Sequence, residues 1–285
     1  MRKNLISYTT ITSLIFSALA CSNADERLSD NEQGFTKDVA RVVTFYNASE
    51  SLTRVGESQF DTGDAIGVFV STKSDGSLSA SNNYADNEKY VYTSGEFINT
   101  GAGIPVANNL GRSVHYYAVY PYQEGVTTSY TFTVSDDQST YEKYMRNDLM
   151  FAYHSAGYTQ NRIPLQFDHM MSRVQVDANS LGLYSGNYRI ELVGFKYSAT
   201  VDLATKTVST TGPASSKNLL MCDDGANHFK ALLPPQMIHK SDVVGSITIG
   251  GRRLPILINS DVELQSGKSV TLKLKKNGDQ YYLAF

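Results

Sequence analysis

The sequence of 285 residues contains no tryptophan and only two cysteines, Cys21 and Cys222. Two cysteines supply neither a disulfide framework nor a cysteine-based metal cluster. After the first 20 residues, no apolar run approaches the ~20 residues that a membrane-spanning helix needs. We therefore expect a mature chain that does not span a membrane, in which Cys222 is a buried or half-buried packing residue.

Motifs of catalysis are also missing. The sequence has no Gly-x-Ser-x-Gly elbow, no phosphate-binding glycine loop and no pair of histidines at the spacing of a zinc helix. Two runs of carboxylates, Asp136-Asp137 and Asp223-Asp224, do not complete the alternating ligand pattern of a calcium loop, and we interpret them as solvated turn residues. We expect no enzymatic activity, no cofactor and no metal site.

Basic residues are in the minority. Without residues 1–20, which carry Arg2 and Lys3, 23 basic side chains face 28 acidic ones, a net charge of -5. A chain with this balance and no basic run has no electrostatic footprint for nucleic acid. Nucleic acid is therefore not an expected partner.

The first 20 residues have the pattern of an export signal: two basic residues, a mostly apolar stretch over 5–19, and Ala20 before Cys21. We interpret Cys21 as the acceptor of acyl chains that anchor the protein to a membrane. An ordinary secretory cut after Ala18-Leu19-Ala20 is the alternative, and it would leave an N-terminal cysteine with no role. Residues 21–34 are polar and acidic, which predicts a flexible tether and resembles the tag of lipoproteins on the outer face of the outer membrane.

The rest of the chain predicts β-structure almost throughout. Short runs alternate apolar and polar residues between Gly- and Asn-bearing turns. The strongest of these runs span 41–46, 65–70, 89–93, 114–120, 130–134, 173–177, 189–193, 246–249 and 270–274. Only 138–146 has a weak helical pattern. About fourteen strands exceed one small sandwich, so we predict an all-β fold with two β-sandwich domains in tandem, over 35–158 and 159–285.

Three local features are predicted from the residues alone. Gly67 allows a close backbone approach or a bulge in its strand, and His169 is expected to cap a strand end or bond a backbone carbonyl. The stretch 115–122 predicts a strand that Pro121 ends, with alternate residues on opposite faces. Those faces are Tyr116, Ala118 and Tyr120 on one side, and Tyr117 and Val119 on the other.

A succession of sequence blocks resembles the fimbrillin-like lipoproteins, relatives of the subunits of type V pili. The blocks are Gly63-Asp64-Ala65-Ile66-Gly67-Val68-Phe69, His115-Tyr116-Tyr117-Ala118-Val119-Tyr120-Pro121-Tyr122, Asp148-Leu149-Met150-Phe151-Ala152, Leu165-Gln166-Phe167-Asp168-His169-Met170-Met171-Ser172-Arg173-Val174 and Leu232-Leu233-Pro234-Pro235-Gln236. The resemblance implies two transthyretin-like sandwiches, export as a lipoprotein, and assembly with other fimbrial subunits at the cell surface by strand exchange.

The resemblance implies that in this family a trypsin-like protease removes the first strand, and that a strand of the next subunit replaces it. The first strand here carries Val43 and Phe45 on one face and Val42 and Thr44 on the other. Arg54 follows in a polar, Gly-bearing stretch and matches the position where family members are cut. The alternatives are that Arg54 is a plain surface residue, or that the subunit is an anchor that stays lipidated and uncut.

The C-terminus supplies a candidate donor strand. Residues 269–275 alternate, Asn277-Gly278 predicts a tight turn, and Tyr281, Leu283 and Phe285 then lie on one face of a second short strand. Apolar residues at every other position of a free chain end suit insertion into another subunit's groove. The closing hairpin of the chain's own domain is the alternative.

Two functions of other classes stay open. The first is a glycan-binding surface lipoprotein of a nutrient-uptake system, in which some of the 19 tyrosines would replace tryptophan as stacking platforms. The second is a hydrolase with an unrecognised site, because the two carboxylates of a glycosidase can lie far apart in sequence. Neither has a motif in this sequence, whereas the resemblance to the fimbrillin-like lipoproteins covers almost the whole mature chain.

Overall fold

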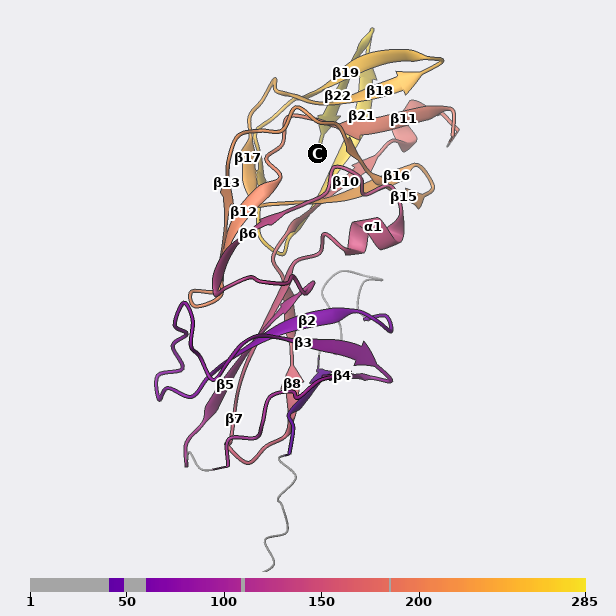
Figure 1. The fold of residues 1–285 in the computed structure, drawn as a ribbon. Coiled ribbons are helices and arrows are strands. Elements are labelled where there is room, and N and C mark those ends of the chain that lie inside the picture. The colour runs from indigo at the N-terminus through magenta and orange to yellow at the C-terminus, as the bar shows by residue number, and fades with distance from the viewer. Residues whose placement is uncertain (1–40, 49–59, 109–110, 185) are drawn as a thin grey trace, which may run out of the picture. The chain divides into compact units, whose positions relative to one another are not determined.

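The computed structural model describes residues 41–48, 60–108, 111–184 and 186–285. Cys21, the tether over 21–34 and Arg54 lie outside these residues, so their roles stay predictions. The described chain is almost entirely β-structure, which confirms the predicted fold class. Figure 1 shows its strands in two β-structured bodies, which we call the first and the second body.

The first body is one eight-stranded sheet with the order β8-β1-β4-β3-β2-β5-β7-β9. Its strands are β1 (Thr44–Asn47), β2 (Ala65–Ser71), β3 (Ala85–Thr93), β4 (Glu96–Ile98), β5 (Val114–Tyr120), β7 (Met150–Ala156), β8 (Arg162–Leu165) and β9 (Phe167–His169). Neighbouring strands run antiparallel except β1 and β8, which run parallel. The first strand of the described chain therefore lies inside the sheet, between β4 and β8.

The second body contains a nine-stranded sheet with the order β14-β11-β18-β19-β22-β21-β10-β16-β15. Its strands are β10 (Ser172–Asp177), β11 (Tyr188–Leu192), β14 (Leu219–Leu220), β15 (Cys222–Gly225), β16 (His228–Leu233), β18 (Val243–Ile249), β19 (Arg252–Ile258), β21 (Ser269–Asn277) and β22 (Gln280–Ala284). Two smaller sheets complete it, β13-β12-β6 and β17-β20. Their strands are β6 (Ser129–Thr133), β12 (Ser198–Asp202), β13 (Thr207–Thr211), β17 (Gln236–Ile238) and β20 (Val262–Leu264).

Helical structure is short. The helix α1 (Tyr141–Met145) lies within the predicted segment 138–146, and its first turn is capped by Thr140, whose hydroxyl accepts the Lys143 N–H. A single 3-10 turn, η1 (Asn179–Leu181), ends at Gly182, which adopts a left-handed conformation. No helix among the described residues is long and apolar enough to cross a membrane.

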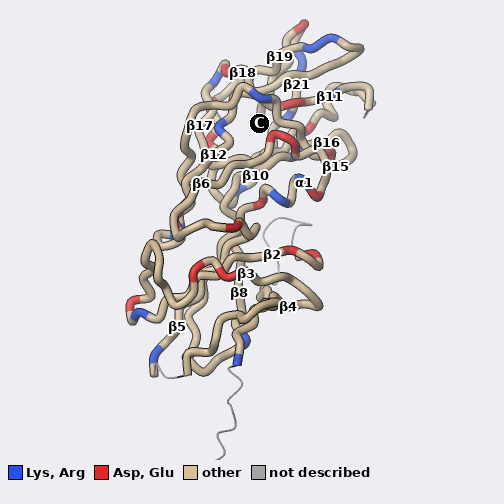
Figure 2. The backbone as a smooth tube through the Cα atoms, in the orientation of Figure 1, with Lys and Arg blue, Asp and Glu red and all other residues tan. Residues whose placement is uncertain are grey.

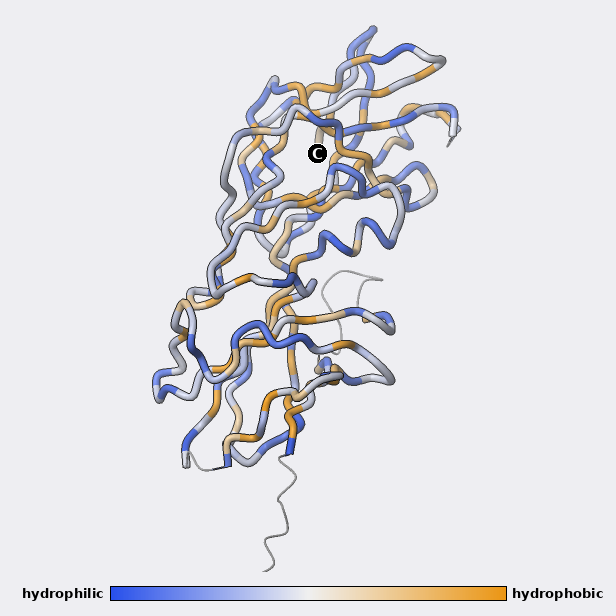
Figure 3. Tube along the Cα trace, viewed as in Figure 1, coloured by the Kyte–Doolittle hydropathy of each residue, from blue (hydrophilic) through white to orange (hydrophobic). Residues whose placement is uncertain are grey.

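Burial follows the strand pattern, with hydrophobic residues along the strands and hydrophilic ones at the turns (Figure 3). Strand β5 is buried on both faces. Tyr116, Ala118 and Tyr120 pack in the core of the first body, whereas Tyr117 and Val119 join a core that includes residues of the second body. This confirms the two predicted faces of β5. Basic and acidic residues are interspersed along both bodies (Figure 2).

The predicted strands are present, but the described residues form 22 strands where the sequence suggested about fourteen. Strand β4 lies inside 94–111, and β14 and β15 lie inside 210–226, two segments in which the sequence analysis named no strand. Each has only two to four residues, and two to four residues are too few to show an alternating pattern.

Strand pairing crosses the predicted domain boundary between residues 158 and 159. Strands β8 and β9, which follow the boundary, belong to the first sheet. Strand β6, which precedes the boundary by more than 20 residues, pairs with β12 of the second body, with Tyr130 opposite Val201. The exact boundary stays a prediction, whereas the assignment of these three strands follows from their pairing.

Candidate functional site: the first strand and its groove

The first strand is held by backbone hydrogen bonds on both sides. Phe45 pairs with Phe97 of β4 in antiparallel register and with Ile163 of β8 in parallel register. Outside the ladder, the Val43 N–H donates to the Ile104 carbonyl at 2.9 Å and the Thr44 N–H donates to the Asn161 carbonyl at 2.7 Å. Strand β1 thus fills a slot in the sheet whose two walls are other strands.

Its side chains alternate between two environments. Val43 and Phe45 are fully buried, whereas Val42 and Thr44 are half-buried. Val42 packs against Gly103, and any side chain at position 103 would collide with Val42. Gly103 also has a φ of +66°, a conformation that favours glycine. The alternation that the sequence predicted is therefore present. The part of these four residues in strand exchange stays a prediction.

The floor of the slot is aromatic. The ring of Phe45 meets Tyr90 edge-on, with centroids 4.8 Å apart, and Tyr116 with centroids 5.6 Å apart. The Tyr90 hydroxyl accepts the Ile104 N–H at 2.9 Å. Burial raises the pKa of both Tyr90 and Tyr116 to about 12. Both phenols are therefore neutral at physiological pH. The rings of the two tyrosines give the pocket of Phe45 an apolar surface, and their uncharged hydroxyl groups are its polar atoms.

The rim of the slot carries charge. Arg162 of β8 forms an ion pair with Glu96 of β4 at 2.6 Å. The same guanidinium lies 4.0 Å from the centre of the Tyr46 ring, a cation–π contact. Because Glu96 and Arg162 stand on the two strands that flank β1, their ion pair bridges the slot over the inserted strand.

The chain re-enters the described region at Phe60, which anchors it in the first core. Phe60 is 7% exposed and contacts four aromatic rings. Centroid distances are 4.9 Å to Phe97, 5.1 Å to Phe167, 5.3 Å to Tyr120 and 5.8 Å to Tyr92. The sequence analysis gave Phe60 no role. Its anchoring means that the body from Phe60 onward has its own attachment, independent of β1.

The C-terminal strand is also an interior strand. β22 pairs antiparallel with β21 and parallel with β19, so in this structure it closes a hairpin in its own domain. Tyr281 and Leu283 are buried, whereas Phe285 is 62% exposed. The predicted shared face of these three residues therefore ends before Phe285, which lies beyond the strand. Donation of β22 to another subunit stays a prediction.

The histidines and paired acids do not converge on one site. His169 hydrogen-bonds the carboxylate of Asp148 at 2.8 Å, with both side chains buried. The sequence analysis expected His169 to cap a strand end or bond a backbone carbonyl, and it missed Asp148 because 21 residues separate the pair. Asp136 pairs with Lys217. Among the described residues, no three His, Cys, Asp or Glu side chains are grouped as they are at a metal site.

Comparison with known proteins gives one family and several similar folds. A family described as fimbrillin-like matches residues 53–281. A crystal structure of a candidate cell-adhesion protein from Bacteroides ovatus aligns with a TM-score of 0.67 at 17% identity, covering 86% of this chain and 95% of that one.

Two further structures share the fold. A candidate cell-adhesion protein from Bacteroides uniformis aligns at a TM-score of 0.61 with 16% identity, over 87% of this chain and 96% of that one. A candidate cell-adhesion protein from Bacteroides thetaiotaomicron aligns at a TM-score of 0.56 with 20% identity, over 84% of this chain and 94% of that one. No curated protein sequence matches the chain.

Proposed function

This chain belongs to the fimbrillin-like family, and from that membership we propose that it is a subunit of a cell-surface fimbria, exported as a lipoprotein through Cys21 and assembled by strand exchange. The observation that carries the proposal is the place of β1. A four-residue strand at the start of the described chain lies between two other strands, with Val43 and Phe45 fully buried.

Removal of β1 would leave a defined vacancy. Phe97 of β4 and Ile163 of β8 would lose their neighbours on one edge, and the pockets of Val43 and Phe45 would stand empty. Unpaired strand edges next to apolar pockets are the surface that an added strand recognises. A donor with apolar residues at every other position would restore both the ladder and the core.

Cleavage after Arg54 would separate β1 from the body without cutting the body itself. Arg54 lies between β1, which ends at Asn47, and Phe60, which is anchored among four rings. The body from Phe60 onward would therefore keep its own anchor in the first core after the cut. Strand β1 would then be held only by its own contacts in the slot.

The C-terminal strand has the side-chain order that the slot requires. Leu283 and Phe285 repeat the spacing of Val43 and Phe45, an aliphatic residue followed two positions later by an aromatic one. Both strands also lie between one antiparallel and one parallel neighbour. Donation requires β22 to leave β19 and β21, and the exposed ring of Phe285 at the chain end is then the first apolar group offered to a partner.

The test is intact mass and N-terminal sequencing of the protein recovered from the surface of cells that produce it, combined with electrophoresis of unheated and heated samples. We expect an N-terminus at Val55 and oligomers that resist heat. Arg54→Ala should abolish both the cut and the oligomers, and Arg112→Ala, at an exposed arginine of the described chain, should change neither.

Other outcomes separate the parts of the proposal. An acylated Cys21 on an uncut monomer would support the lipoprotein and would overturn strand exchange through this subunit's own groove. A free, unmodified N-terminus at Cys21 would overturn lipidation and leave assembly to be judged by the oligomers. Heat-resistant oligomers made by Arg54→Ala would overturn the role of cleavage.

A further inference from the structure

A pocket of about 890 Å³ opens in the second body. One wall is the segment from the end of β6 to α1, and the other comprises the start of β12 and the loop over 213–217. Pockets of several hundred cubic ångströms are the size that binds small ligands. Neither β1 nor β22 contributes a residue to its lining, so the pocket is separate from the proposed assembly site.

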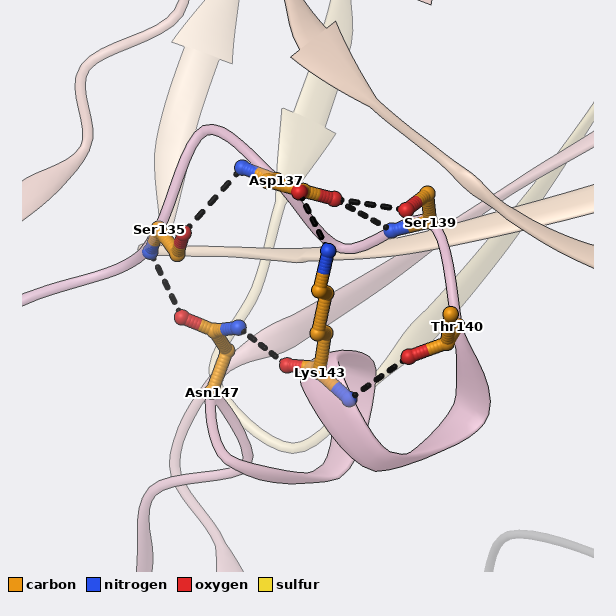
Figure 4. Close-up of polar contacts among 6 residues, drawn as sticks. All are labelled: Ser135, Asp137, Ser139, Thr140, Lys143 and Asn147. Carbon is orange, nitrogen blue, oxygen red and sulfur yellow. Dashed lines mark hydrogen bonds and ion pairs between the residues drawn. The ribbon is translucent and has the colours of Figure 1, made fainter.

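The first wall is held rigid by its own hydrogen bonds (Figure 4). The Asp137 carboxylate accepts from the Lys143 ammonium at 2.5 Å, and the Asn147 side chain accepts the Ser135 N–H at 2.6 Å and donates to the Lys143 carbonyl at 2.7 Å. The Lys143 hydrogen bond, followed by those from Ser139, lowers the pKa of Asp137 below its usual range. These polar groups are therefore positioned by contacts within the wall itself.

The opposite wall is ordered in the same way. Lys217 forms an ion pair with Asp136 at 3.3 Å, and the Tyr197 hydroxyl donates to the Lys217 carbonyl at 2.9 Å. Ser198 of β12 shares a hydrogen bond of 2.8 Å with Thr133 of β6. The lining between these groups includes the smaller apolar side chains of Pro213 and Ala214.

The charges of the lining are already paired. Lys143 is matched by Asp137, Lys217 by Asp136, and Arg146 by Glu142 at 2.6 Å. A charged ligand would have to break one of these pairs, whereas a neutral ligand adds hydrogen bonds to groups that retain free donors and lone pairs. Hydroxyl groups line the rest of the pocket, beside an apolar surface that includes Val134, Pro213 and Ala214.

We propose that this pocket binds a neutral carbohydrate. Sugar hydroxyls would bond the carboxylates of Asp136 and Asp137 and the ammonium groups of both lysines, and the C–H face of a ring would lie on Ala214 and Pro213. The inference goes beyond assembly, because binding needs only a folded monomer. A subunit that fails to polymerise would still bind the sugar, so the two proposals fail separately.

The experiment is a glycan array with the full protein, comparing neutral oligosaccharides with sialylated and sulfated ones, followed by titration calorimetry with the best ligand. We expect binding to neutral oligosaccharides that changes little between low and physiological salt. Ala214→Trp, which fills the pocket, should weaken binding at least tenfold. Ala80→Trp, at an exposed alanine of the first body, is the matched control and should leave binding unchanged.

A second variant protects the test against misfolding. Asp136→Asn keeps the shape of the lining but removes one carboxylate, and we expect it to weaken binding several-fold with an unchanged unfolding midpoint. Three results would overturn the proposal: binding to acidic glycans only, equal binding by Ala214→Trp and Ala80→Trp when both are folded, or no binding to any glycan of the array.

Discussion

Phe45 occupies the most constrained position of the proposed groove. Its side chain is fully buried, it lies between β4 and β8, and it meets two tyrosine rings edge-on. Edge-on aromatic pairs add about 0.5–1.5 kcal/mol beyond the burial of their area. The same residue therefore contributes to the stability of the uncut protein and defines the pocket that a donor strand must fill.

Phe45→Ala is expected to lower the free energy of unfolding by about 3–5 kcal/mol, the range for deletion of a buried ring. Chemical denaturation of the uncut protein measures this loss. Phe285→Ala removes the same side chain from a site that is 62% exposed and should cost less than ~1 kcal/mol. Equal losses in the two variants would contradict the packing described for β1.

Tyr116 should make stability depend on alkaline pH. Burial raises its pKa to about 12 in the folded protein, above the ~10 of an unfolded tyrosine. Between these values the unfolded chain loses the proton and the folded chain keeps it, so the free energy of unfolding falls as the pH rises.

Tyr116→Phe should therefore reduce the slope of stability against pH in this range by up to ~1.4 kcal/mol per pH unit. Urea unfolding at several pH values between 10 and 12 measures the slope. Tyr184→Phe, at a side chain that is 81% exposed, is the matched control. The interpretation would be wrong if the parent and Tyr116→Phe gave the same slope.

At the scale of elements, Gln138 closes a seam of the second body. Its buried side chain donates to the Leu232 carbonyl at 2.9 Å and accepts the Leu232 N–H at 2.8 Å, while its own backbone N–H donates to the Leu220 carbonyl at 2.9 Å. One amide side chain thus takes the place of a neighbouring strand for β16 and connects it to β14. No local pattern in the sequence indicates this role.

Gln138→Leu keeps the size of the side chain and leaves both backbone groups of Leu232 without that amide. Each buried group without a hydrogen bond costs roughly 1–3 kcal/mol, so we expect a large loss in the free energy of unfolding. Gln265→Leu, at an exposed glutamine, should have almost no effect. If denaturation curves showed both variants as stable as the parent, Gln138 would not close the seam.

At the scale of the whole molecule, the two β-bodies share a hydrophobic core. Phe69, Tyr117 and Val119 of the first sheet pack in one cluster with residues of the second body, and β6 pairs with β12. Both bodies of the described chain therefore belong to one compact unit. Two tandem bodies with a shared core are expected to unfold together.

Calorimetry of the uncut protein should therefore show a single transition for both bodies. Phe45→Ala in the first body and Leu283→Ala in the second should each lower the midpoint of that same transition, since both side chains are buried. The van't Hoff and calorimetric enthalpies should agree. Two transitions, each sensitive to one of the variants, would show that the bodies unfold independently.

The sequence by itself determined the properties that depend on neighbours along the chain. Alternation identified the long strands and the two faces of β5. It also identified Val43 and Phe45 as the buried residues that alternate with Val42 and Thr44. Gly67 was expected to permit a close approach, and a side chain there would collide with Asn87. These features are local because side chains alternate with a period of two residues whichever strand lies alongside.

Only the tertiary structure decided which strands are neighbours. The period of two is the same for every partner, so it did not show that β1 runs parallel to β8, more than 100 residues later, or that β6 belongs with β12. The contacts of Asp148 with His169 and of Gln138 with Leu232 likewise join residues that are 21 and 94 positions apart in sequence. Each of these pairings is selected by packing of the whole chain, which brings together groups that no local pattern connects.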